Sequence, residues 1–130
     1  MTGRPNGAAP VVIVPKPWGH ELLWAKTDRY VGKILTVRRG HALSLQYHER
    51  KDETMRLLSG RCEFHVGSEP GSRELKTLEL EPGATIHIRP GVLHRVVALT
   101  DVEILEVSTP DLDDVVRVED RYGRAGTAAP

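Results

Sequence analysis

The chain consists of short runs in which apolar and polar positions alternate. A period of two places one set of side chains on each face of a β-strand, and no window holds the longer 3.6-residue stripe of an amphipathic helix. The pattern therefore predicts an all-β protein. The predicted strands are residues 11–14, 30–37, 42–47, 53–59, 61–66, 74–80, 84–88, 92–98, 102–107 and 114–118.

Turn-forming residues separate these runs at short intervals. Glycine and proline recur between them, as in Ser59-Gly60 and Pro90-Gly91, and such residues favour tight turns. About ten short strands with this spacing are typical of a β-sandwich or of a closed double-sheet barrel of the jelly-roll type.

The length of the chain, 130 residues, is that of a single domain. We expect this domain to span residues 11–124, between a flexible leader at residues 1–10 and a flexible tail at residues 125–130. The leader lacks a long apolar run, so we expect neither a signal peptide nor a membrane anchor.

Composition narrows the classes of partner. The 18 lysines and arginines balance the 18 aspartates and glutamates. We therefore expect no nucleic acid and no membrane as partner, because both favour a basic surface. Cys62 is the single cysteine, which excludes an internal disulfide and favours a reducing, cytoplasmic location.

Four polar side chains occupy positions that normally face the interior of a β-protein. Gln46, His48, Glu53 and His94 each lie on a strand face or at its end, and three of them share that face with small or apolar residues. A buried imidazole or carboxylate is costly unless a partner satisfies it. A divalent metal ion would satisfy all four, so the pattern indicates a metal site.

Each of these side chains has an ordinary explanation when it is taken alone. A single strand histidine is usually a hydrogen-bonded core or rim residue, as we expect for His87. A single glutamate such as Glu53 is usually a solvated edge charge. The joint pattern, and not any one member, favours a metal.

Two spaced motifs carry a family resemblance. Gly40, Gln46, His48, Glu53 and Gly60 follow one another with five, one, four and six intervening residues. This spacing resembles the first cupin motif. Gly83, Arg89, Gly91 and His94 follow with five, one and two intervening residues, which resembles the second motif. The resemblance implies a single cupin-type jelly-roll β-barrel.

Longer stretches resemble the C-terminal phosphomannose isomerase domain of bifunctional mannose-6-phosphate isomerase/mannose-1-phosphate guanylyltransferases, and also small stand-alone cupins. The stretches are KPWGHELLW (16–24), GHALSLQYH (40–48), LLSGRCEF (57–64), GVLHR (91–95), ILEVSTP (104–110) and DDVVRVEDRYGR (113–124). A phosphate-binding glycine loop followed by lysine is absent, so guanylyl transfer is not expected.

The resemblance implies a metal set and a reaction. Gln46, His48, Glu53 and His94 match, in type and order, the metal ligands of the longer zinc-dependent phosphomannose isomerases. Two nitrogen and two oxygen donors suit zinc, with manganese, iron, cobalt or nickel as alternatives. The implied reaction interconverts mannose 6-phosphate and fructose 6-phosphate through a cis-enediol.

Such a reaction needs an acid-base group and a cationic clamp for the phosphate. Glu53 and Lys51 are the predicted catalytic residues, with Glu106 as a second candidate base. The residues predicted to bind the sugar phosphate are Lys33, Arg89, Arg95 and Arg124.

Two further functions remain open from the sequence. His48, Glu53 and His94 also form the two-histidine, one-carboxylate set of non-haem iron oxygenases. Lys51 and Thr54 stand where the bifunctional enzymes have an arginine and a histidine, which favours a non-catalytic sugar or sugar-nucleotide binding barrel. We also expect a homodimer, because pairing with a second copy covers exposed edge strands.

Overall fold

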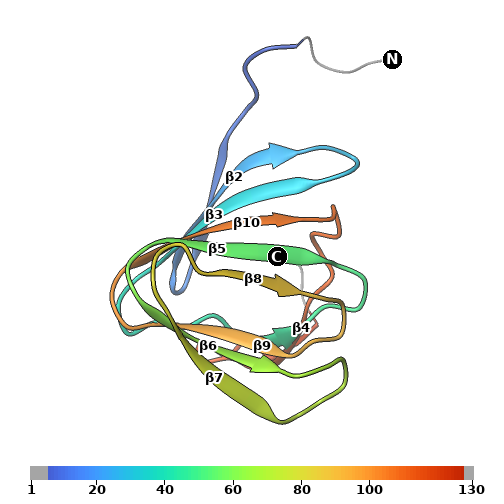
Figure 1. The fold of residues 1–130 in the computed structure, drawn as a ribbon. Helices are drawn as coiled ribbons and strands as arrows, with labels where there is room; N and C mark the ends of the chain where they lie inside the picture. Colours follow the sequence, from blue (N-terminus) through green and yellow to red (C-terminus); the bar gives the residue numbers. More distant parts are fainter. Residues whose placement is uncertain (1–5, 128–130) are drawn as a thin grey trace.

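Two six-stranded antiparallel sheets face each other in the computed structural model, which describes residues 6–127 (Figure 1). The first sheet contains, in spatial order, β1 (Val12–Lys16), β2 (Gly19–Lys26), β3 (Val31–Val37), β10 (Val102–Ser108), β5 (Glu53–Ser59) and β8 (Thr85–Ile88). The second contains β12 (Gly126–Thr127), β11 (Val116–Glu119), β4 (Leu45–Tyr47), β9 (His94–Ala98), β6 (Cys62–Gly67) and β7 (Leu75–Leu80).

Strands from β3 onward alternate between the two sheets, apart from the β6–β7 and β11–β12 pairs. This topology confirms the predicted all-β jelly-roll class. None of the described residues is helical, so no helix in this part of the chain is long and apolar enough to cross a membrane.

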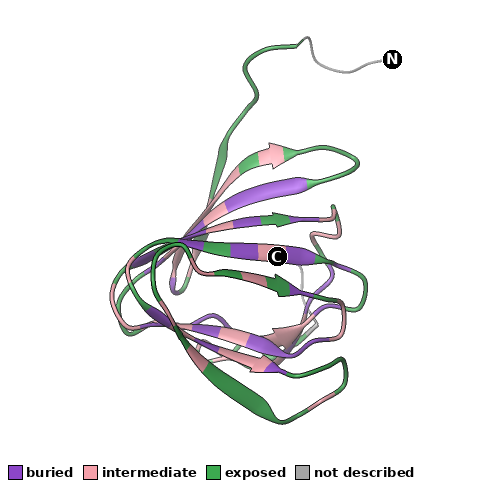
Figure 2. Ribbon diagram, in the orientation of Figure 1, coloured by how far each residue is buried: buried purple, intermediate pink, exposed green. Residues whose placement is uncertain are grey.

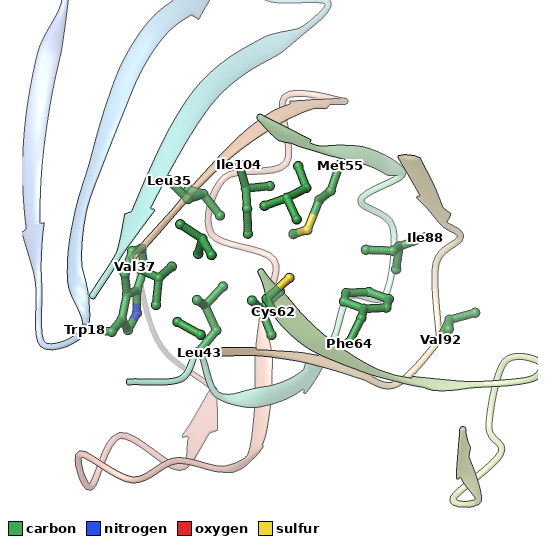
Figure 3. Packing of buried hydrophobic residues seen from close by; sticks show 14 residues of the cluster. Trp18, Leu35, Val37, Leu43, Met55, Cys62, Phe64, Ile88, Val92 and Ile104 are labelled. Atoms are coloured by element: carbon green, nitrogen blue, oxygen red, sulfur yellow. The ribbon is translucent and has the colours of Figure 1, made fainter. Parts of the chain in front are cut away.

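The hydrophobic core lies between the sheets (Figure 3). Leu35, Phe64 and Val96 are buried there, each at most 2% exposed. Burying one such side chain contributes about 1.5–3 kcal/mol relative to leaving it in water. Figure 2 shows the same segregation over the whole fold, with β3 mostly buried and the edge strand β7 mostly exposed.

The inward-facing rows change from apolar to polar toward one end of the sandwich. On β5 the buried face reads Leu57, Met55 and then Glu53. The same change separates Ile104 from Glu106 on β10. Because β5 and β10 are paired in register, with Glu106 opposite Met55, the polar ends of the rows lie at similar levels.

One hairpin was not predicted from the sequence. β2 pairs with both β1 and β3, and its residues are mostly half-buried, without the alternation that marks a strand of a two-faced sheet. Pro17 and Trp18 lie in the turn before it, and Trp18 is 2% exposed.

The second sheet extends beyond the expected domain of residues 11–124. β12 pairs with Val116 and Arg117, so two residues of the stretch that the sequence assigns to a tail belong to a sheet. Residues 6–10 are exposed and outside the strands. The rest of the expected leader and tail, residues 1–5 and 128–130, lies outside the described residues.

Gly60 lies in the turn between β5 and β6. Comparing it with Gly40 separates the cost of a steric clash from the cost of a left-handed backbone. Its φ is 82°, and a Cβ atom there would lie 2.1 Å from the carbonyl oxygen of Asp101. Gly40 has a similar φ of 78°, with open space around the same position. We predict that Gly40→Ala lowers the free energy of unfolding by about 1–2 kcal/mol, the cost of a left-handed alanine.

Gly60→Ala should lower the free energy of unfolding by about 3 kcal/mol or more, because overpacking adds to the cost of a left-handed alanine. Urea denaturation of both variants measures the difference, and equal losses would contradict this account of the β5–β6 turn.

Candidate metal centre

Both sheets contribute side chains to a cavity of about 60 Å³ at the polar end of the sandwich. Glu53 comes from the first sheet, whereas Gln46 and His94 come from the second, where β4 and β9 place them opposite each other. His48 follows directly after β4. The cavity therefore collects residues that are far apart in the sequence.

His48, Glu53 and His94 converge within this cavity. Each offers one ligand atom, and these atoms lie within 4.8 Å of one another. Glu53 Oε2 is 2.6 Å from His48 Nε2 and 3.9 Å from His94 Nε2. All three residues are at most 4% exposed. A group with this donor set is able to bind a metal ion.

The hydrogen bonds of the two imidazoles determine which nitrogen is available. His48 Nδ1 donates to the carbonyl oxygen of Asp114, and His94 Nδ1 donates to that of Val92. A carbonyl oxygen only accepts, so the proton of each neutral ring is on Nδ1 and the lone pair is on Nε2. Burial lowers the pKa of His94 below its ordinary value, which keeps that ring neutral.

The inward-pointing atoms lack hydrogen-bond partners among the residues that the structure describes. This holds for both imidazole Nε2 atoms and for both carboxylate oxygens of Glu53. His48 Nε2 is close to Glu53 Oε2 but without hydrogen-bond geometry. Buried polar atoms are normally satisfied. Lone pairs that converge in this way repel one another unless a cation lies between them, so the chemistry of the donors fits a metal ion.

Asp114 holds the loop that carries His48. Its carboxylate accepts hydrogen bonds from the backbone N–H groups of Glu49, Arg50 and Lys51 at 2.9, 2.6 and 2.8 Å. Burial raises the pKa of Asp114, but these donors outweigh it and lower the pKa below its ordinary value. Asp114 therefore fixes the orientation of His48 through its carbonyl and the shape of the loop through its carboxylate.

Lys51 connects Glu53 with a second buried carboxyl group. Its Nζ is 3.7 Å from Glu53 and 3.2 Å from Glu106. Burial raises the pKa of both carboxyls. For Glu53, Lys51 and the imidazoles overcome this effect and lower the pKa. For Glu106, the adjacent charge of Glu53 adds to burial, and the pKa stays raised. Two neighbouring carboxyls thus differ in proton affinity.

The cavity brings together most of the residues singled out in the sequence. Its lining includes Gln46, His48, Lys51, Glu53, His94, Lys33, Glu106 and Arg124. Arg89 and Arg95 are not part of it. Arg89 is exposed after β8, and Arg95 contacts His65 and Glu119. The alternation along β9 already separates Arg95 from His94, because adjacent strand residues point to opposite faces.

Four charged cavity residues were not anticipated from the sequence: Lys16, Glu21, Asp114 and Arg117. Arg117 alternates with the half-buried Val116 and Val118 and is itself 8% exposed. A charged residue at an inward position of an apolar run was the available signal. Glu21 lies on the unpredicted strand β2, so no pattern pointed to it.

Comparison with known proteins agrees with the architecture. Residues 33–108 match the family described as the cupin domain. The chain is 34% identical over 116 residues to the xanthan biosynthesis protein XanB of Xanthomonas campestris pv. campestris. It is 33% identical over 113 residues to the mannose-1-phosphate guanylyltransferase ManC of Salmonella typhimurium. In each case the match covers 85% of this chain and 23% of the relative, so the chain spans about a quarter of these proteins.

A solved structure extends the fold comparison. KdgF from Halomonas sp. superposes with a TM-score of 0.63 and 22% identity, over 73% of this chain and 82% of that protein. At this identity the likeness concerns the fold alone. Since the family match covers more than half of the residues, from β3 to the end of β10, the chain belongs to the cupin domain family.

Proposed function

We propose that this protein is a metal-dependent sugar-phosphate isomerase that interconverts mannose 6-phosphate and fructose 6-phosphate through a cis-enediol. The observation that carries the proposal is the buried group of His48, Glu53 and His94, next to a second carboxyl of higher proton affinity, Glu106. A relative named mannose-1-phosphate guanylyltransferase supports a sugar phosphate as the substrate class.

Gln46, His48, Glu53 and His94 would hold the metal. All four line one cavity, and two nitrogen and two oxygen donors suit zinc. When bound, a divalent metal supplies a Lewis acid that stabilises negative charge on the sugar oxygens at C1 and C2.

Glu106 is the proposed base. In the aldose it takes the proton from C2 and returns it to C1, while the hydroxyl proton moves from O2 to O1. Its raised pKa suits this exchange near neutral pH, because a base is most effective when its pKa lies close to the working pH. Glu53 is the weaker candidate, since its lowered pKa and its position between the imidazoles favour metal binding.

Lys51 orients the base. It contacts Glu106 at 3.2 Å and keeps a positive charge beside the carboxylates. The cavity of about 60 Å³ has room for small groups, not for a whole hexose phosphate. The reacting end of the sugar would therefore enter the cavity, and the rest would lie toward its opening.

The first prediction concerns metal content. Wild-type protein purified without added metal should contain about one divalent ion per chain, and His48→Ala should lose it, because one strong ligand of a four-ligand site is removed. Elemental analysis measures both.

His65→Ala is the matched control, since His65 is not among the cavity residues. Wild-type protein that stays metal-free after reloading at neutral pH would exclude the proposed metal site.

The second prediction concerns Asp114. Asp114→Ala should weaken zinc binding by about 10–100-fold, because the His48 loop loses its anchor while every proposed ligand is retained. Competition with a chromogenic chelator gives the affinity. Asp113→Ala, at the exposed neighbouring position, should bind zinc as the wild type does. Unchanged affinity in Asp114→Ala would show that the loop needs no carboxylate support.

The third prediction concerns turnover. Glu106→Gln should lower kcat for mannose 6-phosphate by about 100-fold or more while the metal content stays unchanged, because a base contributes about 10²–10⁴-fold. Glu103→Gln, exposed on the opposite face of β10, is the control. A coupled assay for fructose 6-phosphate measures the rate.

Fully metallated wild-type protein without isomerase activity would refute the proposal. Oxygen consumption by the iron(II)-loaded protein would then favour the oxygenase alternative. Stabilisation by a sugar ligand without turnover would favour the binding-module alternative.

A further inference from the structure

The wall of the cavity on the side of β1, β3 and β11 is cationic. Lys16, Lys33, Arg117 and Arg124 all line it. Lys16 and Lys33 come from the first sheet and Arg117 from the second, whereas Arg124 lies in the turn between β11 and β12. Two sheets and one turn therefore direct positive charge toward one space.

Arg117 lacks a charged partner. It is 8% exposed, and among residues 6–127 no carboxylate lies within ion-pair distance and no side-chain hydrogen bond is formed. Lys16 is almost equally isolated, with an 8% exposed side chain and a single carboxylate, Glu21, at 3.9 Å. Burying an unpaired charge costs several kcal/mol. An anionic ligand would offset that cost.

The cationic wall carries more positive than negative charge. Glu21 is shared by Lys16 and Lys33, at 3.9 and 3.0 Å, and Asp120 pairs with Arg124 at 2.9 Å. Four cations thus face two carboxylates. Burial lowers the pKa of Arg117, and the nearby charge of Arg124 lowers it further. Two unmatched positive charges correspond to a phosphate monoester, which carries about −1.5 to −2 at pH 7.

The part of the cavity next to the candidate metal ligands has the reverse balance. There, Lys51 serves both Glu53 and Glu106. A divalent cation next to the carboxylates and a dianion next to the four cations would balance the charge of both parts. Arg117 is paired in register with Gln46, which in turn is paired with His94. Arg117 therefore adjoins two candidate metal ligands within one sheet.

Hydrogen bonds within the protein hold residues 120–124 in place without a ligand. Tyr122 OH is 2.7 Å from His41 Nδ1, and Arg121 donates to the carbonyl oxygen of Gly40 at 3.0 Å. Asp120 accepts from the backbone N–H and the guanidinium of Arg124. These contacts pre-organise Arg124 at the cavity, which reduces the entropy cost of binding.

We propose that Lys16, Lys33, Arg117 and Arg124 form the subsite that binds the phosphate group of the substrate. The inference rests on the proposed function for the identity of the sugar, but the anion site itself follows from the cationic wall. It assigns a ligand role to Lys16 and Arg117, and it replaces Arg89 and Arg95 as the predicted clamp.

Calorimetric titration with inorganic phosphate at low ionic strength tests the subsite. The wild type should bind phosphate saturably, and Arg117→Gln and Lys16→Gln should each weaken binding by at least about tenfold, as expected for a charge-assisted contact. Arg117→Lys should recover part of the affinity because it retains the charge. Acetate, a monoanion, should bind at least about tenfold more weakly than phosphate.

Arg61→Gln is the matched control. Arg61 is exposed, pairs with Glu79 and is not among the cavity residues. The Arg61→Gln substitution removes one positive charge, as Arg117→Gln does, and should leave phosphate affinity within about twofold of the wild type. Circular dichroism confirms that each variant is folded. If Arg117→Gln does not fold, Lys16→Gln and Arg117→Lys still decide the outcome.

Absence of phosphate binding to the wild type, or equal binding by wild type, Arg117→Gln and Lys16→Gln, would overturn the inference. His48→Ala separates this result from the metal proposal, because phosphate should still bind to it. Phosphate binding without isomerase activity would refute the proposed function and leave the anion subsite intact. Isomerase activity whose KM is unchanged in Arg117→Gln would refute the phosphate subsite and leave the proposed function intact.

Discussion

The buried carboxylate of Glu53 is the group around which the polar half of the sandwich is organised. It is 2% exposed, and its oxygens meet two imidazole lone pairs and the ammonium of Lys51. A carboxylate in such a place is unfavourable unless positive charge compensates it. Lys51 supplies part of that charge, but Lys51 is shared with Glu106. The site therefore retains a deficit of positive charge that a divalent metal would fill.

This deficit explains how one cavity can serve two kinds of ligand. The side of Glu53 and Glu106 has more carboxylates than cations, and the side of Lys16 and Arg117 has more cations than carboxylates. An excess of opposite sign in the two parts of the cavity orients a ligand whose ends differ in charge. A sugar phosphate has hydroxyl oxygens at one end and a dianion at the other.

The apolar half of the molecule provides the rigid frame for this arrangement. Leu57 and Met55 continue the buried face of β5 up to Glu53, and Ile104 does the same on β10 up to Glu106. Interiors of this kind are close-packed and deform little. The polar side chains are therefore presented from strands whose positions are set by core packing, and His48, the one proposed ligand outside a strand, is held by Asp114.

The sequence by itself determined the all-β class and the faces of the individual strands, because side-chain alternation is a local property of extended backbone. It placed Gln46 with His48. The same alternation separates Arg95 from His94, but the sequence prediction still assigned Arg95 to the phosphate clamp. It did not indicate β2, whose residues are half-buried on both faces. Only the tertiary structure decided which faces meet. The pairing of β4 with β9 and β11 joins Gln46 to His94 and Arg117, residues 48 and 71 positions apart in the chain. Such pairing depends on contacts between distant segments, which no local pattern encodes.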